Sequence, residues 1–404
     1  MTTDVLRDVL VPEPLFGEAP AVARREDGCI RGDLVIADGR AADLVPAPPG
    51  PSPRVVLPAL VEAHCHLDKC HTIGRMTGIG GNLRQAIEAQ TADKQNWSKA
   101  DLHDRIGRGM DEAIASGCGL LRTHVDWSTD IAPPPAWSVI GDAAAERPGL
   151  TVDRSALVGI DILAEPGVAD AIAAGIARTG GTLGAFVLDH GNRETGLRAT
   201  FAAADRYGLA LDFHVDEGLA DGLDGLGLIA EIAIETGFQG PILCGHCCSL
   251  MNLDGAPLTR LLDRIARAGL FVTALPTTNL YLQGRGPGTP DRRGLTRLRE
   301  LHAADVPIAI ASDNVADAFC PTGFHDPMAA LNLAVLTGHL DPPFARWLPT
   351  ITTNAARALG AAPVQVKGAR LENLRISEAR TLPALVSGRH AHPTSLTLQT
   401  TPAQ

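Results

Sequence analysis

The chain has 404 residues, 45% of them hydrophobic, and a formal net charge of -11 at pH 7. This acidic balance excludes nucleic acid and anionic membrane as the main partner, because both reward clustered lysine and arginine side chains. No stretch approaches the roughly 18 consecutive apolar residues of a membrane helix, and the charged first ten residues lack the apolar core of a signal peptide. We therefore predict a cytoplasmic protein whose eight cysteines are free thiols.

The beginning and the end of the chain differ in pattern from its centre. Residues Ile30–Ile36 predict one strand of a hairpin, and the Pro/Gly-rich residues 46–53 predict a linker. Short apolar segments return near the end, such as Ala384–Val386. We expect residues 1–57 and 366–404 to pair as a small β-domain, outside a catalytic domain formed by residues 58–365.

The central part alternates eight short apolar runs with longer segments of helical pattern, such as Leu258–Ala268. Near-continuous apolar strands separated by helices are typical of a parallel sheet buried on both faces, and eight of them suit a closed barrel. We therefore predict an α/β fold, a (β/α)8 barrel of the TIM type. Its predicted strands are Val55–Val61, Gly119–Val125, Val152–Val158, Leu183–Leu188, Leu209–Val215, Pro241–His246, Gly269–Leu275 and Val306–Ala311.

Histidine and aspartate side chains stand at the ends of four of these strands. They are His64 and His66 after the first strand, His214 in the fifth, His246 in the sixth and Asp313 after the eighth. Active sites of such barrels form at the carboxyl ends of the strands, and imidazole and carboxylate are the ligands expected for Zn²⁺ or Fe²⁺. Because His64 and His66 are two residues apart on an extended segment, both point to the same face and can bind one ion.

Other residues near the strand ends are less informative. Cys244 and Cys247 have the spacing of a redox or zinc pair, but strand alternation places them on opposite faces, which argues against that function. His124 and Asp126 end the second strand, and Asp189 follows the fourth. Whether these three line the pocket or fix the geometry of the ligands stays open.

The histidine and aspartate pattern resembles a known family. His64-x-His66, His214, His246 and Asp313 together resemble the signature of the amidohydrolase superfamily. The closer resemblance is to cytosine deaminases, because Leu67-Asp68 follows the paired histidines and Glu217 stands three residues after His214. Their seventh-strand loop is matched by Asn279-x-x-Leu282-Gln283-Gly284-Arg285 and by Arg292–Arg297, and the similarity spans roughly residues 58–354.

This resemblance implies roles for particular residues. The implied metal ligands are His64, His66, His214 and Asp313. Glu217 becomes the proton shuttle and His246 the residue that orients the nucleophile, with Asp313 also accepting a proton. The implied substrate-binding residues are Gln283, Asn314, Phe319 and Gly159. Gly159 stands at or near the position where the cytosine enzymes have a glutamine that reads the pyrimidine edge. Because glycine has no side-chain amide, we expect cytosine to be a poor substrate.

The number of metal ions follows from the lysines. Many members of the superfamily hold two ions bridged by a carboxylated lysine on the fourth strand. No lysine occurs between Lys99 and Lys367, so such a bridged pair is impossible in this chain. We therefore expect one divalent ion, Zn²⁺ or Fe²⁺, per chain.

The implied function is a deaminase that removes an amino group from a small nitrogen heterocycle and releases ammonia. Hydrolysis of an N-alkyl amine or a cyclic amide on the same scaffold is the alternative, and ammonia release separates the two. A non-catalytic binding barrel is a third interpretation, disfavoured because a binder needs neither Glu217 nor His246. We expect a small-molecule substrate and a homo-oligomer.

Overall fold

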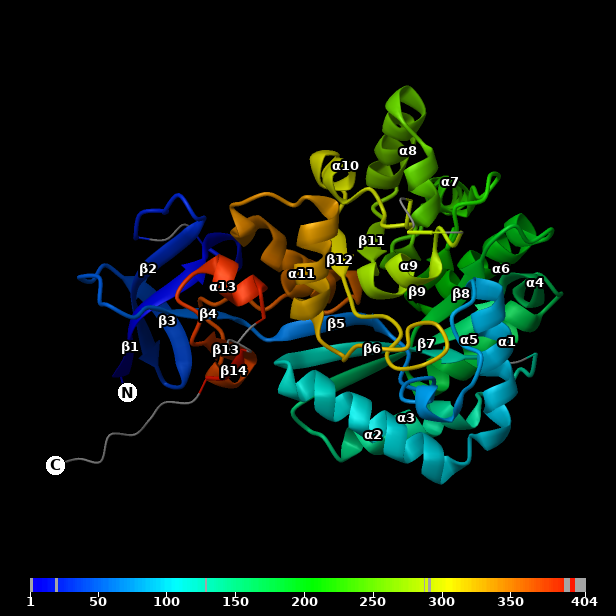
Figure 1. The fold of residues 1–404 in the computed structure, drawn as a ribbon, viewed down its shortest axis with the longest axis horizontal. Helices are drawn as coiled ribbons and strands as arrows, with labels where there is room; N and C mark the ends of the chain where they lie inside the picture. Colours follow the sequence, from blue (N-terminus) through cyan, green and yellow to red (C-terminus); the bar gives the residue numbers. More distant parts are fainter. Residues whose placement is uncertain are drawn as a thin grey trace.

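The computed structural model describes residues 3–18, 21–127, 129–286, 288–289, 292–388 and 393–396. Two sheets organise it, one in each half of the molecule in Figure 1. The larger sheet has eight strands in the order β12-β11-β10-β9-β8-β7-β6-β5, and all of its pairs are parallel. Its strands are β5 (Leu60–Cys65), β6 (Cys118–Asp126), β7 (Thr151–Gly159), β8 (Leu183–Val187), β9 (Leu211–Val215), β10 (Ile242–His246), β11 (Phe271–Ala274) and β12 (Ile308–Ile310).

The larger sheet closes on itself just beyond its last strand. Cys65 at the end of β5 forms a parallel bridge with Asp313, and the Asp313 amide donates to the His64 carbonyl at 2.9 Å. The predicted (β/α)8 barrel is therefore confirmed, and the closure itself brings a predicted ligand beside the paired histidines.

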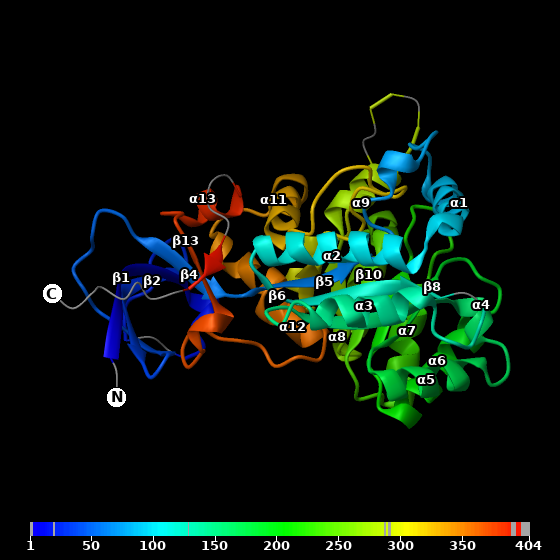
Figure 2. The same ribbon diagram turned by 90° about the horizontal axis from the view of Figure 1, so that it is seen from below.

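Helices surround the barrel, as Figures 1 and 2 show. The segment predicted to be helical at Leu258–Ala268 is α8, which buries Leu258, Leu262 and Ile265 on its inner face. The helices between the strands are α1 (Leu83–Asp93), α2 (Lys99–Ala115), α3 (Pro135–Ala145), α4 (Ile160–Leu163), α5 (Val168–Thr179), α6 (Arg193–Tyr207), α7 (Gly225–Thr236), α8 (Gly255–Arg267), α9 (Pro276–Leu282) and α10 (Leu298–Ala303). After the last strand come α11 (Pro327–Gly338) and α12 (Thr353–Ala358). Among the described helices, none is long and apolar enough to cross a bilayer.

The smaller sheet joins the two ends of the chain, in the order β14-β13-β4-β1-β2-β3. The predicted hairpin strand at Ile30–Ile36 is β2, paired with β3. The predicted small β-domain is thus confirmed as a structural unit, while its residue boundaries stay a prediction. Its strands are β1 (Thr3–Pro12), β2 (Cys29–Ala37), β3 (Arg40–Val45), β4 (Arg54–Pro58), β13 (Leu374–Ser377) and β14 (Thr394–Ser395).

The predicted first barrel strand, Val55–Val61, is two strands rather than one. Residues 54–58 form β4 in the small sheet, where they pair with β1 and β13. The change of sheet falls between two neighbouring amides: Ala59 donates to Asn373, and Leu60 donates to Gly117 at the base of the barrel. The apolar run at residues 55–61 does not reveal where the chain passes from one sheet to the other, because apolar residues are buried in both sheets.

The apolar segment Ala384–Val386 is helical, although we expected it in the β-domain. It belongs to α13 (Leu382–Val386), whose start is capped by the Thr381 hydroxyl accepting from the Ala384 amide at 3.3 Å. Leu382, Leu385 and Val386 have helical spacing and join the large core of the barrel. Residues 389–392 and 397–404 of the predicted β-domain lie outside the described residues.

Candidate metal centre and active-site pocket

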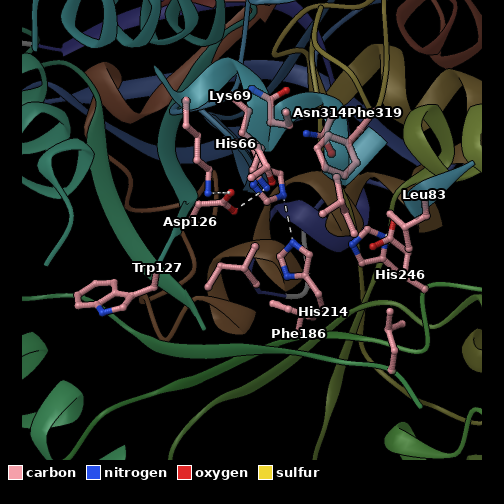
Figure 3. Close-up of a pocket in the computed structure, with 17 residues that line it drawn as sticks. His66, Lys69, Leu83, Asp126, Trp127, Phe186, His214, His246, Asn314 and Phe319 are labelled. Atoms are coloured by element: carbon pink, nitrogen blue, oxygen red, sulfur yellow. Dashed lines mark hydrogen bonds and ion pairs between the residues drawn. The ribbon is translucent and has the colours of Figure 1, made fainter. Parts of the chain in front are cut away.

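Four side chains predicted as metal ligands converge at the carboxyl end of the barrel. The Nε2 atom of His214 lies 3.1 Å from His64 Nε2 and 3.0 Å from His66 Nε2. Asp313 Oδ1 lies 3.3 Å from His66 Nε2 and 3.6 Å from His64 Nε2. All four side chains are buried, and Figure 3 shows the His66 and His214 rings pointing toward each other.

The potential ligand atoms of His64, His66, His124 and His214 lie within 4.8 Å of one another, and those of His64, His246 and Asp313 form a second such group, so the cluster could hold a metal ion. Ligands held at about 2.0–2.2 Å from a zinc ion lie about 3–3.5 Å from one another, close to the separations seen here. Burial lowers the pKa of His66 to about 3 and the pKa of His64 and His214 well below the usual value, so the imidazoles are neutral and keep a lone pair. Within the described part of the chain, neither oxygen of Asp313 accepts a well-formed hydrogen bond. A divalent ion satisfies all of these atoms together, so the residues fit it.

The position of Asp313 depends on its neighbour in the chain and on a buried acid. The Ser312 hydroxyl donates to Glu62 Oε2 at 2.6 Å, and the Ser312 amide donates to Glu62 Oε1 at 3.1 Å. Burial raises the pKa of Glu62 to about 8. Asp313 itself has a φ of 62°, a conformation that non-glycine residues adopt mainly where their surroundings hold them. These contacts turn the carboxylate toward the histidines.

Glu217 and His246 face the same centre from the fifth and sixth strands. Glu217 Oε1 lies 3.6 Å from His246 Nδ1. The His246 Nδ1 also contacts Asn279 Oδ1 at 3.0 Å. Because the amide oxygen of Asn279 accepts the hydrogen bond, His246 Nδ1 carries the proton, and the lone pair of His246 Nε2 is free. Burial raises the pKa of Glu217 to about 7, with His246 opposing the shift and Asp313 reinforcing it. A carboxyl that is protonated near neutrality can donate a proton to a bound ring.

A cavity of about 240 Å³ opens above these groups. It combines aromatic and aliphatic walls with a few polar groups, the usual composition of a small-molecule site. Figure 3 shows its wall residues as sticks. They are His66, Lys69, Leu83, Ile87, Gln90, Thr91, Lys94, Asp126, Trp127, Leu157, Phe186, Leu188, His214, Glu217, His246, Asn314 and Phe319.

Two of the four predicted substrate-binding residues line this cavity, namely Asn314 and Phe319. Gly159 and Gln283 are absent from the wall formed by the described residues. Gly159 precedes α4, and a Cβ there would lie 3.4 Å from the Phe186 ring. Gln283 Nε2 donates to the Glu217 backbone carbonyl at 3.3 Å, so it contacts the segment carrying the proposed proton shuttle.

The structure also distinguishes the three residues whose roles the sequence left open. Asp126 lines the pocket. Asp189 is exposed and stands away from the wall. The His124 ring is buried, with its centroid 3.9 Å from that of His64, and its Nε2 lies 3.0 Å from Asp212 Oδ1. His124 therefore belongs to the buried histidine cluster, with a potential ligand atom within 4.8 Å of those of His64, His66 and His214, and it also contacts Asp212.

Sequence reasoning missed a pair of lysines on the pocket wall. Lys69 Nζ lies 2.8 Å from Asp126 Oδ1, and Lys94 Nζ lies 2.9 Å from Asp126 Oδ2. Burial would raise the pKa of Asp126, but the two lysines hold it well below its usual range, so the group is ionised. The chain has only four lysines, at 69, 94, 99 and 367. The scarcity of lysine was a usable signal, because Lys69 stands only three residues after His66 and therefore close to the predicted site.

Comparisons with known proteins agree with this geometry. The profile of the amidohydrolase family matches residues 167–364. The pterin deaminase of Rhizobium rhizogenes (strain K84 / ATCC BAA-868) is 34% identical over 349 residues, which cover 83% of this chain and 79% of that protein. The N-isopropylammelide isopropyl amidohydrolase of Pseudomonas sp. (strain ADP) is 25% identical over 283 residues, covering 67% and 66% of the two chains. The structure of 5-methylcytosine deaminase from Klebsiella pneumoniae superposes with a TM-score of 0.79 at 22% identity, covering 99% of this chain and 100% of that one.

The barrel, the buried histidine and aspartate cluster and the pocket above it define a metal-dependent hydrolase. The chain belongs to the amidohydrolase family. It is a hydrolase of carbon–nitrogen bonds other than peptide bonds, and the predicted assignment to the amidohydrolases with a cytosine deaminase-like fold is confirmed.

Proposed function

We propose that the protein is a mononuclear metal-dependent deaminase whose substrate is a fused two-ring amino-heterocycle of the pterin type. The reaction class, deamination of a nitrogen heterocycle, rests on the relatedness to a deaminase at 34% identity. The observation that carries the finer proposal is the pocket: its volume of about 240 Å³ exceeds what a single pyrimidine ring fills. Trp127, Phe186 and Phe319 offer aromatic surfaces of the kind that hold flat ring systems.

The ligands His64, His66, His214 and Asp313 would hold one divalent ion, Zn²⁺ or Fe²⁺. Such an ion lowers the pKa of water from 15.7 to about 7 and so supplies a nucleophile at neutral pH. The hydrogen bond to Asn279 fixes the His246 ring, and the free His246 Nε2 is left to orient that nucleophile. The Asp313 carboxylate would accept a proton from the attacking water.

Glu217 acts on the substrate. Its carboxyl faces the cavity and is protonated near neutrality, so it would donate a proton to the ring nitrogen beside the amino-bearing carbon. That proton makes the carbon a better electrophile. The resulting carboxylate would then take up a proton from the oxygen of the attacking water and pass it to the departing amine, and the products are ammonia and the ring carbonyl compound. This is the proton-shuttle role that the resemblance implies.

A second candidate is release of an alkyl amine from an N-alkylated ring. It is favoured by the similarity to the isopropyl amidohydrolase and by Leu83 and Ile87, two aliphatic side chains of α1 on the pocket wall. The two reactions are distinguished by their volatile product, which is ammonia for one and an alkyl amine for the other.

The substrate proposal predicts a ranking. Purified enzyme should release ammonia from pterin with a kcat/KM inside the usual enzymatic range of about 10⁴–10⁸ M⁻¹s⁻¹. Cytosine should be poorer by at least about 10²-fold, because Gly159 offers no side-chain amide to read the pyrimidine edge and Leu157 is the residue of that strand on the pocket wall. Ammonia release from pterin, cytosine, guanine and N-isopropylammelide under identical conditions measures this.

Two results would change the proposal. A cytosine kcat/KM near 10⁶ M⁻¹s⁻¹ would refute the argument from Gly159, since that is the value of a good enzyme. Isopropylamine from N-isopropylammelide, without ammonia from pterin, would favour the second candidate instead.

We further propose that the enzyme works in the cytoplasm on a free small molecule, without nucleic acid, and as a homo-oligomer. The net charge of -11 supports the exclusion of nucleic acid. Light scattering coupled to size exclusion measures the oligomeric state directly.

A further inference from the structure

A second group of metal-ligating side chains lies outside the catalytic pocket. It consists of His71 on the segment after β5, Glu112 on α2 and His325 on the segment between β12 and α11. His71 Nε2 lies 3.3 Å from Glu112 Oε1, and His325 Nδ1 lies 3.3 Å from Glu112 Oε2. The potential ligand atoms of the three residues all lie within 4.8 Å of one another. None of the three lines the catalytic pocket.

The histidines of this group are buried and incompletely satisfied. The side chains of His71 and His325 are only 4% and 0% exposed. Within the described ranges, neither nitrogen of His71 has a well-formed hydrogen bond, and the same holds for His325 Nε2. His71 Nε2 is thus close to the Glu112 carboxylate without being aligned with it. Two ligands of one ion have this relation, because each points at the ion and the ligands are separated by about 3–3.5 Å.

The charges of the group also suit a cation. Burial alone would raise the pKa of Glu112, but contacts with His325 and His71 hold it well below its usual range, so the carboxylate is ionised. Burial lowers the pKa of His325, which favours the neutral form that binds metals. Arg108 Nε lies 3.3 Å from Glu112 Oε1, but that side chain is 62% exposed and can swing into solvent.

Helix α2 makes room for the group. A Cβ at Gly109 would lie 2.6 Å from Leu67 Cδ2 and 3.0 Å from His325 Cε1, so a larger side chain there would push against both neighbours. Glu112 also borders a hollow on the outer side of α2, formed with Arg108 and Asp111, which gives an ion a path from solvent.

We propose that His71, Glu112 and His325 bind a second divalent cation of the zinc class, separate from the catalytic ion. Two imidazoles and one carboxylate are a common ligand set for Zn²⁺, with one position left for water. The ion would join α2 to the segments that follow β5 and β12, and these segments also carry the proposed catalytic ligands His66 and Asp313. The catalytic centre stays mononuclear, and the chain holds two ions in place of the one expected from the sequence.

The test counts ions and does not depend on enzymatic activity. Full-length protein is saturated with Zn²⁺, dialysed, and analysed by mass spectrometry for zinc per chain. We expect His325→Gln and Glu112→Gln each to hold one zinc ion fewer than the wild type. The zinc-dependent rise in Tm should also become smaller in both variants, because binding to the folded state alone stabilises it. After substitution with Co²⁺, the absorption of the wild type minus that of His325→Gln should show the bands of a nitrogen- and oxygen-ligated ion.

The matched control is His103→Gln. His103 also lies on α2 and contacts a glutamate, with its Nε2 3.1 Å from Glu146 Oε1, but it belongs to none of the three-ligand groups of the described chain. This variant should keep the wild-type zinc count. Equal counts in wild type and in a folded His325→Gln would overturn the proposal and leave a hydrogen-bonded triad. Should His325→Gln fail to fold, a count of a single ion in saturated wild type overturns it equally.

Discussion

Replacing Glu217 by glutamine should lower kcat by about 10²–10⁴, the usual contribution of a positioned general acid or base. The amide is nearly isosteric and can still donate a hydrogen bond to the ring, so KM should change less. It cannot give up a proton, so the chemical step slows. The proposed metal ligands are other residues, and we expect the variant to keep its catalytic ion and its Tm. Steady-state kinetics of ammonia release, with metal analysis of the same preparation, measures both parts.

The pH profile gives an independent check on Glu217. Burial raises its pKa to about 7, so the acid form is present below that pH and disappears above it. A reaction that needs protonated Glu217 should therefore lose activity as the pH rises through about 7. This limb should vanish from the residual activity of Glu217→Gln, because the amide does not titrate.

The control for Glu217→Gln is Asp189→Asn, which also changes a carboxylate to an amide after a barrel strand. Asp189 is exposed and outside the pocket wall, so this variant should match the wild type. If Glu217→Gln retained its metal and nearly all of its kcat, Glu217 would have no part in the chemistry, and hydrolysis of an N-alkyl or cyclic amide would become the preferred function.

The sequence could predict the barrel and the convergence of the proposed ligands, because both depend on local periodicity. His64 and His66 share a face through the two-residue repeat of a strand. The carboxyl ends of parallel strands meet at one edge, and this brings in His214, His246 and Asp313 without any knowledge of packing.

The pocket wall could not be predicted in the same way. Leu83, Ile87 and Lys94 come from α1 and the turn after it, a segment inserted between the first two barrel strands. Their contact with the site depends on how that helix folds back over the barrel. No periodic pattern encodes this arrangement.

Buried polar networks were also hidden, because their members are far apart in the chain. Arg122 Nη1 donates to Asp212 Oδ2 at 3.0 Å across 90 residues, and His325 contacts Glu112 across 213 residues. Each residue alone has the pattern of an ordinary charged or core position. Only the closed barrel brings them together.

Replacing Asp313 by alanine should remove the catalytic ion and abolish deamination, as should His64→Ala. The Asp313 carboxylate is fully buried beside three neutral imidazoles and supplies the only negative charge among the four proposed ligands. Its removal should weaken metal binding by more than the roughly 10–100-fold typical of losing an outer partner of a ligand. Asp212→Asn, which alters the residue behind His124, should show that smaller effect.

The ion is best counted in the His325→Gln background, so that the second proposed site does not contribute. In that background the parent should hold one divalent ion and Asp313→Ala should hold none after dialysis, with circular dichroism confirming that the barrel remains folded. Wild-type metal affinity in Asp313→Ala would remove this residue from the ligand set. Two tightly bound ions in the catalytic pocket of the parent would contradict the mononuclear centre, since the fourth strand, Leu183–Val187, has no lysine to bridge them.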